Sequence, residues 1–118
     1  MPKYSIPRPD AIRLHHMLDA AREARSFVEG KSLVDVTRNR QLALSLIKDI
    51  ETIGEAASNV SPETQAALPA IGWRMIIATR NRLVHVYFDV DFKVVWETAT
   101  QDLGPLIAAL ESALRPEQ

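Results

Sequence analysis

An arginine occupies the middle of an otherwise apolar helical stripe. Arg80 follows Ile76 by four residues and precedes Leu83 by three, a spacing that puts all three on one face of a helix. A guanidinium is always charged in a protein, so its burial requires a hydrogen-bonded anion. That anion is either a carboxylate of the chain, with Glu51 and Glu55 available, or the phosphate of a ligand. In a third arrangement the alkyl stem is buried and the guanidinium reaches solvent.

A histidine follows this arginine within two helical turns. In an unbroken helix, His85 is separated from Arg80 by about 140° of rotation and about 7.5 Å of rise. The two side chains converge only if the helix ends or distorts around Val84, or if a second copy of the chain supplies its own pair across a two-fold axis. Asn81 shares a face with His85, where its amide can orient the imidazole or hold a phosphate oxygen, and Tyr87 adds a hydroxyl.

The remaining candidate residues indicate neither a metal nor a cofactor. His15 and His16 are adjacent, so on a helix they point about 100° apart and do not form a chelating pair. The four glycines are isolated from one another, which excludes a glycine-rich phosphate loop. Cysteine is absent, which excludes thiolate metal sites and cysteine nucleophiles and favours a reducing cytoplasm. We therefore expect no metal site and no cofactor.

Composition restricts how this chain meets its partners. Its 118 residues carry 14 Lys and Arg against 15 Asp and Glu, so any contact with nucleic acid must come from a local basic patch. The longest apolar stretches are far shorter than the roughly 20 residues that cross a bilayer, and the N-terminus lacks a signal-peptide core. We therefore expect a cytoplasmic protein without a membrane segment.

Apolar residues recur at helical spacing along most of the chain. After Asp10, an acid suited to cap a helix, the pattern predicts a first helix that ends near Gly30. A coiled-coil-like seam predicts a second helix from about Val36 to Asn59. Ser61-Pro62-Glu63 predicts the start of a short helix that Pro69 ends.

Two more helical stretches complete the pattern. One carries Trp73 and Arg80, and the other begins at Phe92 and runs to Leu114 with a kink or break at Gly104-Pro105. Both tryptophans match core positions. The sequence predicts an all-α antiparallel bundle of four to five helices, forming a single domain over residues 1–118 with frayed ends at 1–8 and 115–118.

The stretch from Arg80 to Tyr87, RNRLVHVY, is similar to the R-N-x-x-x-H-x-Y signature of the HepT-like toxins, the DUF86 branch of the HEPN superfamily. Other segments resemble the same family in the same order. They are Ile53-Gly54-Glu55-Ala56 (I-G-E-A), Trp73-Arg74 (W-R), Asp89-Val90-Asp91 through Trp96, and Asp102-Leu103. The resemblance covers about residues 8 to 112.

This resemblance implies a HEPN-like two-fold homodimer with an endoribonuclease site at the dimer cleft. It also implies a toxin neutralised by a cognate minimal nucleotidyltransferase antitoxin, which can transfer AMP to the signature tyrosine, here Tyr87. RNA cleavage without metal needs a proton carrier and a cation, and His85 and Arg80 supply these with Asn81 beside them. We expect Glu55 to align Arg80 or His85 from a neighbouring helix.

A non-catalytic function is the alternative. The same helical dimer would bind a nucleotide or a protein and scaffold a nucleotidyltransferase. Arg80 and Asn81 would then grip phosphate while His85 only donates or accepts a hydrogen bond.

Overall fold

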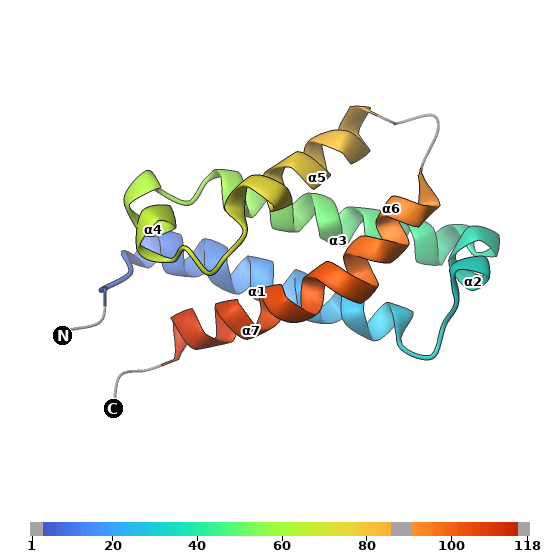
Figure 1. The fold of residues 1–118 in the computed structure, drawn as a ribbon, viewed down its shortest axis with the longest axis horizontal. Coiled ribbons are helices and arrows are strands. Elements are labelled where there is room, and N and C mark those ends of the chain that lie inside the picture. The colour runs from blue at the N-terminus through green and yellow to red at the C-terminus, as the bar shows by residue number, and fades with distance from the viewer. Residues whose placement is uncertain (1–3, 86–90, 116–118) are drawn as a thin grey trace.

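Two long helices, α1 (Arg8–Val28) and α3 (Arg40–Ser58), pack against each other along the centre of the structure (Figure 1). The structure is a computed structural model that describes residues 4–85 and 91–115. The final helical segment lies along α1, and α5 (Trp73–His85) packs on α3. Short helices α2 (Leu33–Arg38) and α4 (Pro62–Ala67) lie at opposite ends of α3. The described residues contain no β-strand, so the all-α prediction is confirmed.

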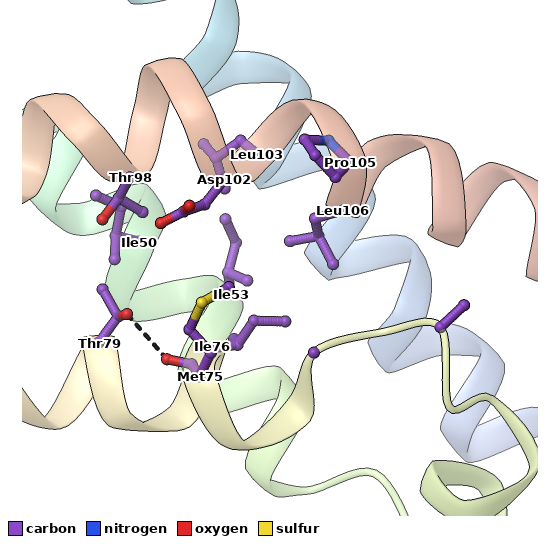
Figure 2. A pocket seen from close by; sticks show the side chains of 12 residues that line it. Ile50, Ile53, Met75, Ile76, Thr79, Thr98, Asp102, Leu103, Pro105 and Leu106 are labelled. Atoms are coloured by element: carbon purple, nitrogen blue, oxygen red, sulfur yellow. Dashed lines mark hydrogen bonds between the residues drawn. The ribbon is translucent and has the colours of Figure 1, made fainter.

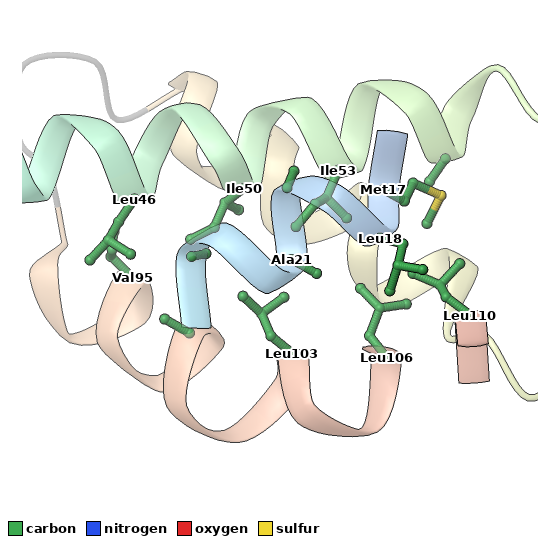
Figure 3. Packing of buried hydrophobic residues seen from close by; sticks show 14 of the residues in the cluster. Met17, Leu18, Ala21, Leu46, Ile50, Ile53, Val95, Leu103, Leu106 and Leu110 are labelled. Carbon is green, nitrogen blue, oxygen red and sulfur yellow. The ribbon is translucent and has the colours of Figure 1, made fainter. Parts of the chain in front are cut away.

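The predicted seam of α3 is buried over its whole length. The side chains concerned are Ala43, Leu46, Ile50, Ile53 and Ala57, followed by Val60 just after the helix. Figure 3 shows Leu46, Ile50 and Ile53 on the side of α3 that faces Leu103 and Leu106, with α1 between the two segments. The apolar core therefore lies among α1, α3 and the C-terminal helical segment.

The second predicted helix is in fact two helices. Asn39 has an extended backbone and separates α2 from α3, and its side-chain oxygen accepts a hydrogen bond from the Leu42 N–H at 3.1 Å. Ser32 and Asp35 form a capping box at the start of α2. The prediction of an unbroken helix from about Val36 to Asn59 is therefore wrong. Asn39 interrupts it because its side chain accepts from a free backbone N–H at the start of α3, as an N-cap does.

Two other predicted ends are confirmed. α1 ends at Val28, and Gly30 follows with a φ of 74°, a conformation that favours glycine. Ser61 caps α4 by accepting from the Thr64 N–H, and Pro62 is the first residue of that helix. By contrast, Asp10 is not the cap of α1, which begins after Pro7, and its carboxylate is used elsewhere.

The C-terminal segment bends through a π-helical turn ahead of Pro105. It consists of α6 (Phe92–Glu97), the π turn η1 (Thr98–Asp102) and α7 (Leu103–Leu114). The Leu103 N–H donates to the Thr98 carbonyl, one residue further back than in an α-helix. Arg25 of α1 donates from Nη1 to the carbonyls of Ala99 and Thr100 at 3.3 and 3.1 Å. The predicted kink thus takes the form of a widened turn that α1 supports.

Candidate ribonuclease site

The stem of Arg80 packs directly on the backbone of α3 at Gly54. A Cβ added at Gly54 would overlap the Cβ of Arg80 and would lie 2.7 Å from its Cγ, closer than real Cβ contacts come. The same added atom would lie 3.4 Å from the carbonyl oxygen of Ile76. Glycine at position 54 therefore allows α5 to approach α3 at the point where Arg80 emerges.

The guanidinium of Arg80 emerges on the exposed side of this contact. Its Nη1 donates to the Oδ1 of Asn81 at 3.1 Å, and Asn81 itself is exposed. Arg80 forms no ion pair with Glu51 or Glu55, so an internal salt bridge with either residue is wrong. The third arrangement described above is the one found, because the stem is packed while the charged group reaches the surface. With respect to residues 4–85 and 91–115, most of its hydrogen-bond donors are free to bind an anion.

The helix that carries Arg80 continues without a break to His85. Val84 is therefore helical, and the helix does not end before the histidine. Within one protomer the backbone positions of Arg80 and His85 are separated by about 140° around the axis of α5. The side chain of His85 and the whole of Tyr87 lie outside the described residues, so their predicted roles stay predictions.

Glu55 lines a different groove. The groove lies between α1 and α3, and Arg13, His16, Thr52 and Glu55 are among the residues that line it. No hydrogen bond or ion pair from the Glu55 carboxylate to Arg80 is found. The Glu55 backbone carbonyl accepts hydrogen bonds from the two residues that end α3 and follow it, Ser58 and Asn59. The residue of the I-G-E-A segment that contacts Arg80 is thus the glycine and not the glutamate.

A cavity of about 200 Å³ opens beside α5, between α3 and the wall formed by η1 and the start of α7 (Figure 2). Its walls are mainly aliphatic side chains, and Asp102 contributes a carboxylate. Burial, with a contribution from the charge of Glu97, raises the pKa of Asp102. The cavity was not predicted from the sequence, although Asp102 is a visible signal because it lies four residues from both Thr98 and Leu106 in an apolar helix.

Comparison with known proteins places this chain in a family. The family model for HepT-like ribonucleases ("Ribonuclease HepT-like") matches residues 17–113. The chain belongs to the HepT-like ribonuclease family.

Two curated relatives are similar over most of their length. A protein of Caldanaerobacter subterraneus subsp. tengcongensis named "Putative RNase" is 29% identical over 95% of this chain and 97% of its own. A protein of Thermococcus cleftensis named "Probable ribonuclease HepT" is 29% identical over 83% of this chain and 89% of its own. No solved structure matches the chain.

Two further carboxylates of this HepT-like chain, Asp49 of α3 and Glu23 of α1, interact with each other. Asp49 is 7% exposed on α3, and one of its oxygens, Oδ2, has no hydrogen-bond partner among the residues that the structure describes. Burial, the hydrogen bond with Glu23 and the charge of Glu23 together raise the pKa of Asp49 to about 7. The described helices include none long and apolar enough to span a bilayer.

Proposed function

We propose that this HepT-like protein is a metal-independent endoribonuclease toxin of the cytoplasm. Its site consists of Arg80, Asn81 and His85 at the cleft of a two-fold homodimer. The observation that carries the proposal is the placement of Arg80. Its stem is fixed against Gly54, and its guanidinium bonds only to the neighbouring amide of Asn81 among the described residues. A fixed and exposed guanidinium without a carboxylate partner is suited to a phosphodiester.

The proposed reaction is an internal transfer within the RNA. The 2′-hydroxyl attacks the adjacent phosphorus, the bond to the 5′-oxygen of the next nucleotide breaks, and a 2′,3′-cyclic phosphate forms. His85 carries a proton in this exchange, since the 2′-oxygen loses one and the 5′-oxygen gains one. Arg80 stabilises the charge that develops on the phosphorane oxygens. DNA is inert because it lacks the attacking hydroxyl.

A second copy of the chain brings the two groups together. Because α5 is unbroken from Trp73 to His85, the arginine and histidine positions of one protomer diverge around the helix axis. Two α5 helices that meet across a two-fold axis present each arginine position to the histidine position of the other copy. Glu55 lines the neighbouring α1–α3 groove and directly follows Gly54 in the chain, and its role in aligning Arg80 or His85 is part of the proposal.

A cognate minimal nucleotidyltransferase is the proposed antitoxin. It would transfer AMP from ATP to the phenolic oxygen of Tyr87 and release pyrophosphate. The modification would add a negative charge and a nucleoside two residues from His85, where substrate phosphate binds. Mass spectrometry of protein co-expressed with the antitoxin tests this step, with Tyr87→Phe as the control. Neutralisation without an added adenylate would contradict it and indicate inhibition by contact alone.

The decisive experiment measures cleavage of end-labelled RNA in the presence of EDTA. We expect the unaltered protein to cleave RNA and leave a cyclic phosphate, and we expect Arg80→Ala and His85→Ala to lose about 100-fold or more in rate. Arg8→Ala is the matched control, because Arg8 is an exposed arginine on a different helix, at the start of α1. Equal activity in all four proteins, cleavage of DNA, or complete loss of activity on chelation would each overturn the proposal.

The same proteins separate the enzyme from the non-catalytic alternative. RNA binding that Arg80→Ala abolishes, without any turnover by the unaltered protein, would favour a helical dimer that only binds nucleotide or protein and scaffolds the nucleotidyltransferase.

A further inference from the structure

The cavity beside α5 offers one charged group to a ligand. Its walls are formed by apolar side chains of three helical segments, among them Ile50, Ile53, Met75, Ile76, Leu103 and Leu106. The two threonines in the lining are already bonded within their own segments. Thr79 donates to the Met75 carbonyl at 2.9 Å, as Figure 2 shows. Thr98 donates to the Val94 carbonyl at 2.8 Å. Asp102 is therefore the polar side chain of the lining that makes no such hydrogen bond within its own segment.

Asp102 has no hydrogen bond or ion pair with any residue that the structure describes. Figure 2 shows its carboxylate between Thr98 and Ile53, on the wall formed by the π turn. A carboxylate is an acceptor with two oxygens, and the apolar side chains around the half-buried Asp102 offer it no donors. Its raised pKa reflects the same shortage, since burial is the main cause. A ligand that brings N–H donors on a flat apolar body would satisfy both the carboxylate and the walls.

The size and the place of the cavity limit what that ligand is. A volume of about 200 Å³ is below the range of roughly 300–1,000 Å³ that is typical of pockets for whole drug-sized ligands. It suits a single ring system. Thr79 lines the cavity and is followed directly by Arg80, so one wall of the cavity lies within a few ångströms of the backbone that carries the proposed phosphate clamp. A nucleotide held by its phosphate at Arg80 has its base within reach of this cavity.

We propose that the cavity binds one base of the RNA next to the scissile phosphate, and that Asp102 selects guanine. Guanine presents two adjacent donors, N1–H and the N2 amino group, which match the two oxygens of one carboxylate. Adenine and cytosine each place a ring nitrogen acceptor beside their amino group, and that acceptor would face a carboxylate oxygen. Enzymes that take up a single base commonly read its Watson–Crick edge in this way, between apolar side chains. This inference rests on the proposed function, which supplies the RNA.

Binding of mononucleotides tests the cavity without any cleavage. The probes are the 3′-monophosphates of guanosine, inosine and adenosine, measured by isothermal titration calorimetry. We expect guanosine 3′-monophosphate to bind about 10- to 100-fold more tightly than the adenosine compound, since a two-point hydrogen bond to a base discriminates by that factor. The inosine compound lacks the N2 amino group and should fall between the two.

Two variants identify the residues responsible. Asp102→Asn keeps the shape of the side chain but replaces one acceptor by a donor, so the preference for guanine should disappear. Met75→Phe enlarges a half-exposed side chain of the wall and should weaken all three nucleotides without unfolding the protein. Asp19→Asn, an exposed aspartate on α1, is the control and should bind as the unaltered protein does. Equal affinities for the three nucleotides, or an unchanged preference in Asp102→Asn, would overturn the inference.

Cleavage mapping separates this inference from the function on which it rests. We expect cuts at one fixed position relative to guanine in an RNA that contains all four bases, and a relaxed pattern in Asp102→Asn. Cleavage without any base preference would overturn the guanine site and leave the ribonuclease standing. Selective guanine binding by a protein that cleaves no RNA would support the cavity and overturn the ribonuclease.

Discussion

The side of the molecule built from α1, α3 and α7 differs sharply from the side built by α5. Leu14, Met17, Leu46 and Leu110 of the first side are wholly buried. Among the α5 side chains that the structure describes, those of residues 73–83, Leu83 alone is buried, and Met75 is 52% exposed. α1 packs against two long segments, whereas α5 packs chiefly on α3 (Figure 1).

This difference shows how one small domain divides its tasks. The buried core of the side built from α1, α3 and α7, called the closed side below, holds the fold, because buried apolar area is the main stabilising term. A helix fastened along one side keeps its other side available for a second copy and for RNA. Elements with few buried contacts are also those that open most readily. The proposed site therefore lies where the chain can offer exposed polar groups at the smallest loss of stability.

The largest expected effect separates the two sides directly. Leu46→Ala should lower the free energy of unfolding by about 2–5 kcal/mol, because it leaves a cavity in the closed core. Met75→Ala on α5 should lower it by less than about 1 kcal/mol, since half of that side chain is already in water. Urea denaturation of both variants measures the contrast. Equal losses would show that α5 is as deeply packed as α3 and would remove the basis of the comparison.

The joint between the two sides gives the next largest effect. Gly54→Ala should lower the free energy of unfolding by about 1–3 kcal/mol, because the new methyl group overlaps the stem of Arg80 and pushes α5 away. The proposed RNA cleavage should fall by about tenfold or more as Arg80 moves.

Gly104→Ala is the control for helix propensity. Apart from its chain neighbours and the backbone of its own helix, no atom of the described residues lies within 4 Å of a Cβ at Gly104, so alanine there should stabilise the protein by about 0.5–1 kcal/mol. If both alanine variants stabilise, the close approach at Gly54 does not constrain α5.

The fold was predictable because burial follows the helical period. The seam of α3 could be identified from spacing alone, and so could the end of α1 at Gly30, since both depend on residues close in the chain. The break at Asn39 was missed because a polar cap inside an apolar pattern leaves the period unchanged. The role of Asp10 as a cap of the first helix was wrong, because its hydrogen-bond partners lie 51 and 54 residues away in the chain.

The site was predictable only in part. Arg80 stood out because a charge interrupted an apolar stripe, and its exposed guanidinium agrees with one of the three arrangements considered. Its contact with Gly54 needs knowledge of which helices meet and at what depth, and spacing within one helix does not contain that. The same holds for the cavity at Asp102 and for the pairing of Glu23 with Asp49, which join residues from separate helices.

Asp10 provides the third test, on the closed side. Its carboxylate accepts from the Ser61 N–H at 3.0 Å, from the Ser61 hydroxyl at 2.6 Å and from the Thr64 hydroxyl at 2.6 Å, which ties α1 to α4. Burial alone would raise the pKa of Asp10, but these hydrogen bonds outweigh it and lower the pKa. Asp10→Ala should lower the free energy of unfolding by about 1–2 kcal/mol at neutral pH, since three donors lose their acceptor.

The direction of this pKa shift predicts how the effect of Asp10→Ala depends on pH. Because the pKa of Asp10 is lower in the folded state, its stabilisation is present above the ordinary carboxyl range and is lost as pH falls through the folded-state pKa. The deficit of Asp10→Ala should therefore shrink in acid, as measured by urea denaturation at several pH values. Asp19→Ala, which removes an exposed carboxylate from the same helix, should change little. A deficit that stays constant with pH would mean that the carboxylate charge contributes nothing to the link.

The smallest expected effect comes from Asp49, a buried carboxylate whose charge destabilises the closed side. Burial and the neighbouring Glu23 raise its pKa to about 7, so the folded state holds a proton that the unfolded state releases near pH 4. Stability from this group is therefore full at low pH and declines as pH rises from about 4 to about 7. Asp49→Asn should remove that decline and raise the free energy of unfolding at pH 8 by about 1 kcal/mol, because it replaces a buried charge with a neutral amide.

Glu23→Gln should shift stability in the same direction by relieving the repulsion while leaving the burial of Asp49. If Asp49→Asn instead lowers the free energy of unfolding at pH 8 as much as at pH 5, the charged carboxylate of Asp49 does not destabilise the closed side, despite the oxygen for which no partner is found among the described residues.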